Sequence, residues 1–525
     1  MRAALVVCVA LVFLTMPGAR ADQGGVPPAK LGTVTFPNSC SPQAQQSLQR
    51  GIALLHSFWF TEAEKSFREA LDRDPGCAVA TWGIATVIIG NTFSVGPLPA
   101  DARRAQEAIN RGRAIGAKTQ RERDYIEAIA TYYDHFAERL NGARMRSLSD
   151  TFESLAARYP DDETQIFDAL YLIASQPLSD KTHARALKAA AILEPQFAKH
   201  PDHPGVAHYL IHAYDFPTLA KKGLPAALCY AGIAPDAYHA LHMPSHIFTR
   251  VGDWKESIDT NLRSIAEAKK ENVTSSVLHA MDYMVYAQLQ LGRDADARAA
   301  VEEAASLASP EVSSLYARAA IPARYLVERD QWMAAAALPS SAASKFPYTE
   351  AMTLFARGIG AARSGNPDAA EKDATSLATI VAALKMAKNE YWATEVEVQR
   401  LAVAAWIAFA RGKRDEALAL MRASADDEDA SEKSAISPGR ILPARELLGD
   451  MLLASGQPAE ALAAYEASLV NDPKRLRSLD GAARAALAAG NAVKARDYYS
   501  RMVEMADTGS DRPELVIARA FVAGK

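Results

Sequence analysis

Small and aromatic residues recur at fixed intervals along this chain. In the stretch GIALLHSFWFTEAEKSFREALDRDP, offsets of 12, 4, 3 and 5 residues separate Gly51, Ala63, Phe67, Ala70 and Pro75. Small residues at such positions let two antiparallel helices cross closely, an aromatic side chain fills the gap between them, and a proline ends the second helix. The pattern predicts a pair of antiparallel helices in this stretch.

The same pattern returns near the other end of the chain. The stretch GDMLLASGQPAEALAAYEASLVNDP carries Gly449, Ala461, Tyr465 and Pro473 at the matching positions. Between the two copies, a glycine suited to a left-handed turn is repeatedly followed, five residues later, by a small residue that opens the next helix. No period-two alternation bounded by hairpin signals competes with this pattern, so we predict an all-α chain. The pairs are Gly252/Ser257, Gly292/Ala297, Gly365/Ala370, Gly412/Ala417, Gly456/Ala461 and Gly490/Ala495.

The N-terminal sequence is typical of a cleavable secretory signal. An apolar run from Ala3 to Met16 is followed by Ala19-Arg20-Ala21, so we expect cleavage after Ala21 and a periplasmic or secreted mature protein. The alternative is an uncleaved anchor, for which the apolar run is short. No later stretch reaches roughly 18 uninterrupted apolar residues, so we expect no transmembrane segment in the mature chain.

The repeat offsets match the 34-residue tetratricopeptide (TPR) repeat, and the chain resembles the TPR superfamily over nearly its whole mature length. It also resembles a group of secreted bacterial TPR proteins through the segments HPGVAHYLIHAYD and HMPSHIFTR, which have the forms HPGxxHYxIHAYD and HMPSHIxxR. The resemblance implies a right-handed superhelix of antiparallel helix pairs, a TPR-like α-solenoid, whose concave groove binds a protein or peptide. It implies no particular reaction.

We predict five regions along the chain. They are a signal peptide at 1–21, an extended leader at 22–39, N-terminal TPR and TPR-like helices at 40–200, His-rich TPR-like repeats at 201–300 and C-terminal TPR repeats at 301–525. The segment ASADDEDASEKSAISPGR, residues 423–440, is polar and acidic and lies between two repeats. We interpret it as a solvated loop rather than a binding tail.

Composition narrows the classes of partner. With 49% hydrophobic and 23% charged residues the chain can bury a large core, and its formal net charge of −4 offers no basic field for phosphates. Nucleic acid is therefore not an expected partner. In an oxidising compartment the mature cysteines Cys40, Cys77 and Cys229 allow one intramolecular disulfide. Because Cys40 precedes the first helix of the first repeat and Cys77 follows its second helix, we predict that these two are bonded.

Nine of the eleven histidines fall between residues 183 and 279. If Ser257 is the small residue that opens the second helix of its repeat, His239, His242 and His246 lie on the first helix. In TPR proteins these first-helix positions line the concave groove. Helical geometry agrees, since offsets of 0, 3 and 7 residues at about 100° each fall within roughly 60° of arc. Pro244 interrupts this helix, and it either kinks the helix or marks the start of a new one.

Matching positions in the neighbouring repeats are also polar. His208 and His212 lie 34 residues before His242 and His246, and the next repeat has His279, Asp282 and Tyr286 at the places of His239, His242 and His246. First helices of successive repeats pack side by side at roughly 8–10 Å, so side chains at matching places can converge.

Two His-x-x-x-His pairs on neighbouring helices favour a site for a divalent transition metal such as Zn or Cu. We predict a ligand set in which Asp282 binds the metal or orients an imidazole, and we assign groove binding to His279 and Tyr286. The alternatives are a polar groove that binds a peptide without metal, and a purely structural network. The predicted ligands are His208, His212, His239, His242, His246 and Asp282.

No catalytic residue is assigned. The segment HYLIH lacks the glutamate that follows the first histidine of His-Glu-x-x-His metallopeptidases, and no Gly-x-Ser-x-Gly or phosphate-binding glycine loop occurs. His56 is interpreted as a packed core histidine. The expected function is an extracytoplasmic TPR scaffold that holds a protein or peptide partner in its groove and a metal at its histidines. The alternative is a metal-dependent enzyme, hydrolase-like, or a metal carrier that uses the same histidines.

Overall fold

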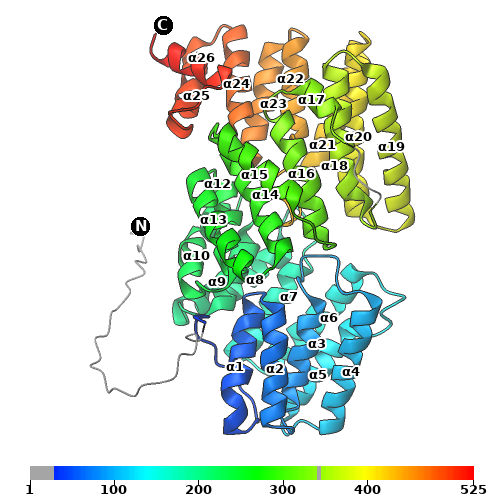
Figure 1. The fold of residues 1–525 in the computed structure, drawn as a ribbon, viewed down its shortest axis with the longest axis vertical. Helices are drawn as coiled ribbons and strands as arrows, with labels where there is room; N and C mark the ends of the chain where they lie inside the picture. Colours follow the sequence, from blue (N-terminus) through cyan, green and yellow to red (C-terminus); the bar gives the residue numbers. More distant parts are fainter. Residues whose placement is uncertain (1–28, 340–343, 525) are drawn as a thin grey trace.

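The computed structural model describes residues 29–339 and 344–524, and in these residues every regular element is a helix (Figure 1). The predicted signal peptide at 1–21 lies outside the described residues. Residues 29–41 form no helix or strand and lead into α1, and the first part of the predicted leader at 22–39 lies outside the described residues. In the part of the chain that the structure describes, no helix has the length and apolar character needed to span a membrane.

The helices follow one another along the chain in three tiers, from the lower to the upper end of Figure 1. The lower tier holds α1 (Pro42–His56), α2 (Phe60–Arg73), α3 (Val79–Ile89), α4 (Pro99–Ile115), α5 (Gln120–Tyr133), α6 (Asn141–Arg158) and α7 (Asp162–Ala174). The middle tier holds α8 (Ala184–Lys199), α9 (Pro204–Tyr214), α10 (Ala220–Ile233), α11 (Tyr238–His242), α12 (Pro244–Val251), α13 (Trp254–Lys270), α14 (Thr274–Gln290) and α15 (Asp294–Ser306). The upper tier holds α16 (Val312–Val327), α17 (Trp332–Ala336), α18 (Pro347–Arg363), α19 (Pro367–Met386), α20 (Glu390–Ala410), α21 (Arg414–Asp429), α22 (Ala444–Ala454), α23 (Pro458–Asn471), α24 (Leu476–Ala488), α25 (Ala492–Met505) and α26 (Pro513–Val522).

The small and aromatic residues of the first predicted repeat have the expected packing. Phe67 of α2 is fully buried between Gly51 of α1 and Gly83 of α3. A Cβ atom at Gly51 or Gly83 would lie 2.7 or 2.6 Å from the Phe67 ring, so neither position has room for a larger side chain. The aromatic ring therefore holds two successive helix pairs together, and the predicted all-α, TPR-like solenoid of antiparallel helix pairs is confirmed.

The C-terminal copy repeats this arrangement. Tyr465 of α23 lies between Gly449 of α22 and Gly481 of α24, where an added Cβ would approach its ring to 2.8 and 2.3 Å. The predicted turn glycines all adopt the left-handed conformation, with φ between 71° and 86°. They are Gly252, Gly292, Gly365, Gly412, Gly456 and Gly490.

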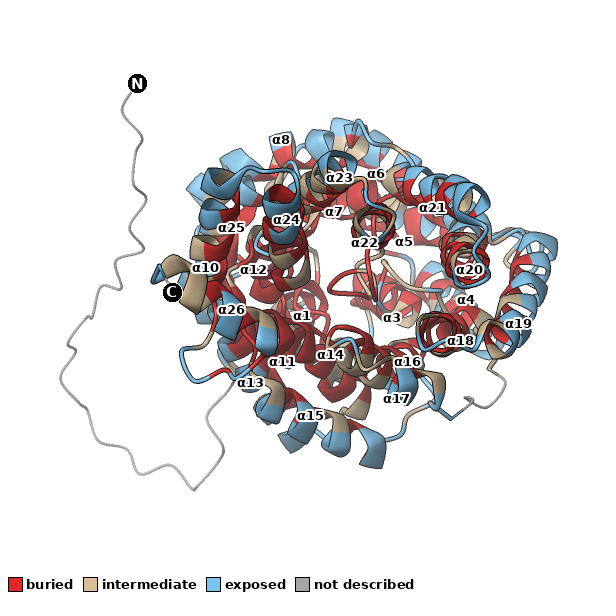
Figure 2. Cartoon of the chain, turned by 90° about the horizontal axis from the view of Figure 1, so that it is seen from above, coloured by how far each residue is buried: buried red, intermediate tan, exposed pale blue. Residues whose placement is uncertain are grey.

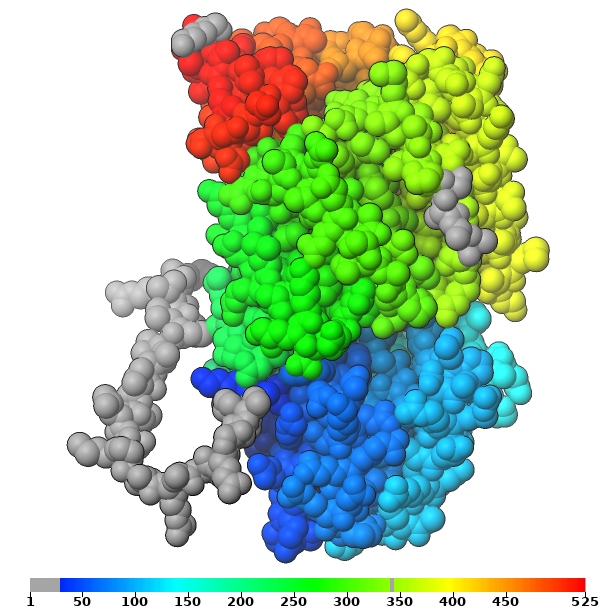
Figure 3. Space-filling model, viewed as in Figure 1, coloured from blue at the N-terminus to red at the C-terminus, as the bar shows by residue number. Residues whose placement is uncertain are grey.

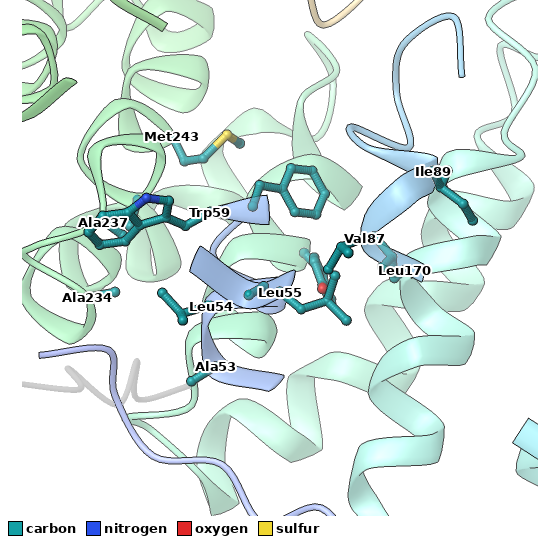
Figure 4. Packing of buried hydrophobic residues seen from close by; sticks show 14 of the residues in the cluster. Ala53, Leu54, Leu55, Trp59, Val87, Ile89, Leu170, Ala234, Ala237 and Met243 are labelled. Carbon is teal, nitrogen blue, oxygen red and sulfur yellow. The ribbon is translucent and has the colours of Figure 1, made fainter. Parts of the chain in front are cut away.

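Viewed from above, the helices form a ring whose inward-facing residues are mostly buried (Figure 2). Two hydrophobic clusters fill the helix layers, one running from Leu31 to Ile321 and the other from Val312 to Ala518, so that both include residues of α16. The middle segment, green in Figure 3, packs directly on the blue N-terminal helices. Figure 4 shows Trp59, after α1, lying beside Ala237 and Met243 of the His-rich repeats.

The predicted disulfide between Cys40 and Cys77 is confirmed. It joins the residue just before α1 to the segment after α2, with 4.7 Å between the two Cα atoms. Closing a loop of 37 residues in the unfolded chain contributes roughly 3–4 kcal/mol to stability on the chain-entropy model. The bond therefore secures the first repeat.

The segment 423–440 is not the solvated loop that its composition predicted. Its first part belongs to α21, and the connection that follows, residues 430–443, lies inside the ring; we name it the inner loop. Its Glu432 amide donates to the Leu178 carbonyl at 2.7 Å, and the Tyr283 hydroxyl of α14 donates to the carbonyls of Ala435 and Ser437 at 3.0 Å each. The loop is buried because its polar groups find partners on the inner wall, which composition alone does not reveal. It also fills part of the space that we expected to hold a partner.

Candidate functional site: a six-histidine centre

Three successive helices of the inner wall carry the predicted ligands: α9, the broken helix α11–α12, and α14. Pro244 begins α12 at its first turn, so the alternative of a new helix start is the one observed. Met243 nevertheless keeps a right-handed helical conformation, and its amide donates to the His239 carbonyl while its carbonyl accepts from the His246 amide. The break therefore leaves His239, His242 and His246 on one side of the backbone.

Six histidines meet in two groups of three, which we call the first and the second triad and together the six-histidine centre. The first triad is His208, His212 and His239, and the second is His242, His246 and His279. In each triad one ring nitrogen per residue lies within 4.8 Å of one from each of the other two. The triads adjoin, because ring centroids of His212 and His246 are 5.6 Å apart and those of His239 and His242 are 6.1 Å apart.

Oxygen acceptors hold one nitrogen of several of these rings. The Nδ1 atoms of His208 and His246 lie 2.6 Å from the His56 carbonyl and 2.9 Å from the Asp215 carboxylate. His242 Nδ1 lies 2.7 Å from Asn261 Oδ1, and the Asn261 amide nitrogen donates to the Ser257 carbonyl, which fixes the orientation of that amide. Because each acceptor requires a proton on Nδ1, the Nε2 atom of each ring carries a lone pair.

These lone pairs point at other histidines. His242 Nε2 and His246 Nε2 are 3.1 Å apart, and each is the unprotonated nitrogen of its ring. His208 Nε2 lies 3.2 Å from His239 Nε2, where the tautomer of His239 decides whether that ring donates. His212 Nε2 and His279 Nδ1 are buried without a hydrogen-bond partner. Facing lone pairs repel and buried unpaired nitrogens are costly, so the arrangement suits a cation between the rings.

Burial lowers the pKa of all six imidazoles, and for His246 the Asp215 carboxylate opposes this lowering. Burial lowers the pKa of His208 to about 3 and that of His279 to about 3, and the neighbouring histidines add charge repulsion in the same direction. The pKa values of His212, His239 and His242 lie well below the usual 6.5 for the same reasons. Metal ligation requires neutral imidazole, so these rings need no deprotonation at pH 7.

The surroundings of the first triad are aromatic. Phe93 stacks on His212 with 3.9 Å between ring centroids. Phe58 packs edge-on against His208 at 4.5 Å and stacks on His239 at 5.2 Å. These rings remove water from one side of the triad and hold the imidazole planes in place.

The surroundings of the second triad are polar. Asp215, which accepts a hydrogen bond from His246, also accepts one from Arg250 Nε at 2.8 Å. Lys433 Nζ of the inner loop lies 3.5 Å from the same carboxylate. Tyr283 stands 3.3 Å from His246 Nδ1 while it donates to the inner loop. The carboxylate is therefore buried with two positive partners and contacts the second triad only through the His246 imidazole.

The six rings differ in burial. His208, His212, His242 and His246 are between 0 and 6% exposed, whereas His239 and His279 are half-buried. The Nδ1 atom of His279 is nevertheless buried, so the exposed part of that ring is not this nitrogen.

Two residues predicted for the site lie elsewhere. Asp282 belongs to neither triad; its Oδ1 atom is 3.4 Å from Arg324 Nε of α16, and burial raises its pKa to about 6. Tyr286 is buried and accepts a hydrogen bond from Arg475 at 3.2 Å. Asp282 lies three and Tyr286 seven residues beyond His279 on α14, where the helix faces α16 and the inner loop. His279, which we predicted as a groove residue, completes the second triad.

Several residues that contact the six-histidine centre were not predicted from the sequence, although two of them lie in motifs that we had already noted. Asp215 ends the segment HPGVAHYLIHAYD, three residues after His212. Phe58 lies in HSFWF, beside His56. Asn261 and Phe93 carry no local signal, because they reach the centre only through helix packing.

A third group of acidic and histidine side chains lies next to the centre. His56, fully buried as expected, contacts Glu163 at 3.0 Å, and His203 contacts the other Glu163 oxygen at 3.0 Å. His56 Nδ1 lies 2.8 Å from the Tyr209 hydroxyl, and His203 Nδ1 accepts from the Val206 amide. Each of these nitrogens has an oxygen or backbone partner, so we treat this group as structural and name it the Glu163 group.

Comparisons with known proteins concern the fold alone. No protein-family model matches the chain, and no curated protein sequence matches it. Among solved structures, yeast Tom70 shares 11% identity with a TM-score of 0.27, over 92% of this chain and 96% of that one. A tetratricopeptide repeat protein from Parabacteroides merdae shares 11% with a TM-score of 0.24, over 76% and 98%. The TPR domain of P58(IPK) shares 13% with a TM-score of 0.20, over 92% and 98%.

Proposed function

We propose that this chain is an extracytoplasmic TPR scaffold that binds transition-metal ions, Zn or Cu, in its six-histidine centre. The observation that carries the proposal is the 3.1 Å approach of His242 Nε2 to His246 Nε2, with both Nδ1 atoms committed to oxygen acceptors. A cation between the two nitrogens turns this repulsion into attraction. The buried and unpaired Nε2 of His212 supports the same conclusion for the first triad.

The Glu163 group argues against a purely structural role for the centre. Where histidines serve the fold, a carboxylate lies between them and each nitrogen has a partner. The six-histidine centre has no such oxygen between its rings. Oxygen acceptors instead lie behind the rings, as they do for metal-ligating histidines in general.

We also propose that the chain binds a protein or peptide partner, because helix-pair solenoids of this kind are interaction scaffolds. The inner loop restricts where a partner binds, since it already covers the inner faces of α14 and α16 through Tyr283 and Arg324. The partner surface is therefore the part of the ring that the inner loop leaves free. The extracytoplasmic location is supported by the N-terminal sequence and by the Cys40–Cys77 disulfide.

A second candidate function, a metal-dependent enzyme or metal carrier, is favoured by one observation. Three imidazoles in each triad leave a fourth coordination position, and half-buried His239 and His279 stand on the solvent side. Catalytic metal sites keep such a position open, whereas structural sites close it.

Metal analysis of the exported protein, purified without chelator, tests the proposal. We expect transition metal in the parent and none in the double variant His212→Ala/His246→Ala, which loses one nitrogen from each triad. Circular dichroism should show equal helical content in both, because the repeats are held together by residues such as Phe67 and Tyr465 rather than by the centre. The matched control is His135→Ala, whose side chain is 72% exposed and remote in sequence from the centre. Equal metal in parent and double variant rejects the site.

A further inference from the structure

The second triad repeats the first, one helical repeat further along the chain. Each takes two histidines four residues apart, on α9 in the first triad and on the broken helix α11–α12 in the second, and a third from the next inner helix. His242 and His246 follow His208 and His212 by 34 residues, which is the TPR repeat length. The third ligands, His239 on α11 and His279 on α14, are also the two half-buried rings. The centre is therefore two matched three-nitrogen sites and not one larger site.

The matched sites are close enough to act on one small molecule. Ring centroids across the boundary are 5.6 Å apart for His212 and His246, and 6.1 Å for His239 and His242. Paired metal sites in enzymes place their ions roughly 3.5–4 Å apart and clamp the ligand that lies between them. The two triads are therefore near enough for ions held in them to share one small ligand.

Charge decides which ions suit the pair. The six ligands are neutral, and the one carboxylate that touches them, Asp215, is already paired with Arg250 and lies near Lys433. Asp282 contacts Arg324 through Oδ1 and belongs to neither triad. Two divalent ions would bring four positive charges into a buried site whose own ligands carry no charge, and such burial is costly. Two monovalent ions bring half that charge, and imidazole suits copper.

We propose that the six-histidine centre holds a pair of cuprous ions, one in each triad, and binds one dioxygen molecule reversibly between them. This inference rests on the proposed function, which requires only that the centre binds transition metal. The step balances without further reactants. Each Cu(I) gives one electron to dioxygen, which becomes a bound peroxide with two negative charges, while both coppers become Cu(II). Release returns both electrons and restores dioxygen.

The same step leaves the charge of the buried centre unchanged. Two Cu(I) carry two positive charges, and two Cu(II) with one peroxide also carry two. The protein therefore needs no compensating proton or carboxylate, in agreement with the neutral ligand set. The nearby Tyr283 hydroxyl does not protonate the bound peroxide, because it is engaged by the carbonyls of Ala435 and Ser437. Phe58 and Phe93 keep water from the first triad, and His239 and His279 are the half-buried rings at which a small gas would enter.

The test loads chelator-treated full-length mature protein with cuprous acetonitrile complex under nitrogen and then admits air. We expect two coppers per chain, uptake of one dioxygen per chain, and an intense near-ultraviolet charge-transfer band that vanishes on deoxygenation. The oxygenated protein should be silent in electron paramagnetic resonance, because two Cu(II) ions that share a peroxide couple their spins. His135→Ala should behave like the parent.

His239→Ala and His279→Ala extend the test, since each removes the third ligand of one triad at a half-buried position. Either variant should lose the reversible band and the dioxygen uptake while it still binds copper at the intact triad. Two coppers per chain in the parent without dioxygen uptake, or with the resonance signal of two isolated Cu(II) ions, overturn this inference and leave the proposed function standing. One copper per chain overturns the pair but not metal binding. No bound copper, zinc or other transition metal overturns both.

Discussion

The six-histidine centre and the Glu163 group lie side by side and use the same side chain in opposite ways. They touch through His56, whose ring belongs to the Glu163 group and whose carbonyl accepts the Nδ1 proton of His208. In the Glu163 group a buried carboxylate lies between two imidazoles and satisfies both. In the centre, imidazole meets imidazole, and the acceptors lie behind the rings. Histidine content therefore says little about a site until the position of the nearest oxygen is known.

Among the changes considered, removing the Glu163 carboxylate should lower the free energy of unfolding the most. Glu163→Ala leaves two buried histidines without an acceptor, and breaking such a buried pair costs roughly 3–5 kcal/mol of the free energy of unfolding. Chemical denaturation measures the change. Metal content of the folded variant should equal that of the parent, and its loss would show that the two groups are not independent.

Removing metal should destabilise the protein through the centre alone. Ligand binding to the folded state adds about 4 kcal/mol when free metal exceeds its dissociation constant a thousandfold, and chelation removes that gain. The melting temperature should therefore fall on chelation in the parent and in Glu163→Gln. It should not change in His212→Ala/His246→Ala, and an equal fall in that double variant would place the bound metal elsewhere.

Acid should act on the Glu163 group in a defined pH window. Burial alone would raise the pKa of Glu163, but the charge of His203 and the hydrogen bonds from His203 and His56 hold it well below 4.5. The charged form thus stabilises the fold fully above pH 4.5, and the gain is lost as pH falls below that value, because the unfolded chain takes up the proton first. The slope reaches at most about 1.4 kcal/mol per pH unit. Denaturation at a series of pH values should show a shallower slope for Glu163→Gln, and identical slopes would contradict the assignment.

The smallest effect is expected from the residues behind the rings. Asn261→Ala removes the acceptor of His242 Nδ1 and should weaken metal binding at the second triad about tenfold, the lower end of such effects. Binding at the first triad should be unchanged, which a competition titration with a metal indicator resolves as two steps. An equal loss at both triads would show that the triads do not bind independently.

Much of the architecture was predictable because its determinants are local. The spacing of Gly51, Phe67 and Pro75 predicts a helix pair. The six turn glycines adopt the left-handed conformation that their positions predicted. The inner loop was not predictable. Its polar sequence and the acidic run before it resemble a solvated segment, yet Glu432 contacts His183 and Lys433 lies near Asp215 in the interior of the ring. A charged side chain can be buried when a residue distant in sequence pairs with it, and local composition does not reveal that residue.

For the histidines, the sequence by itself determined that His208, His212, His239, His242 and His246 converge, because helical periodicity and the 34-residue repeat are both local rules of spacing. Only the tertiary structure decided that they form two triads, that His279 completes the second, and that Asp282 is turned away toward Arg324. The physical reason is that a small rotation of one helix against the next decides which of two neighbouring side chains enters the shared interior. That rotation is set by the packing of α14 on α16 and on the inner loop, whose residues are distant in sequence from the histidines.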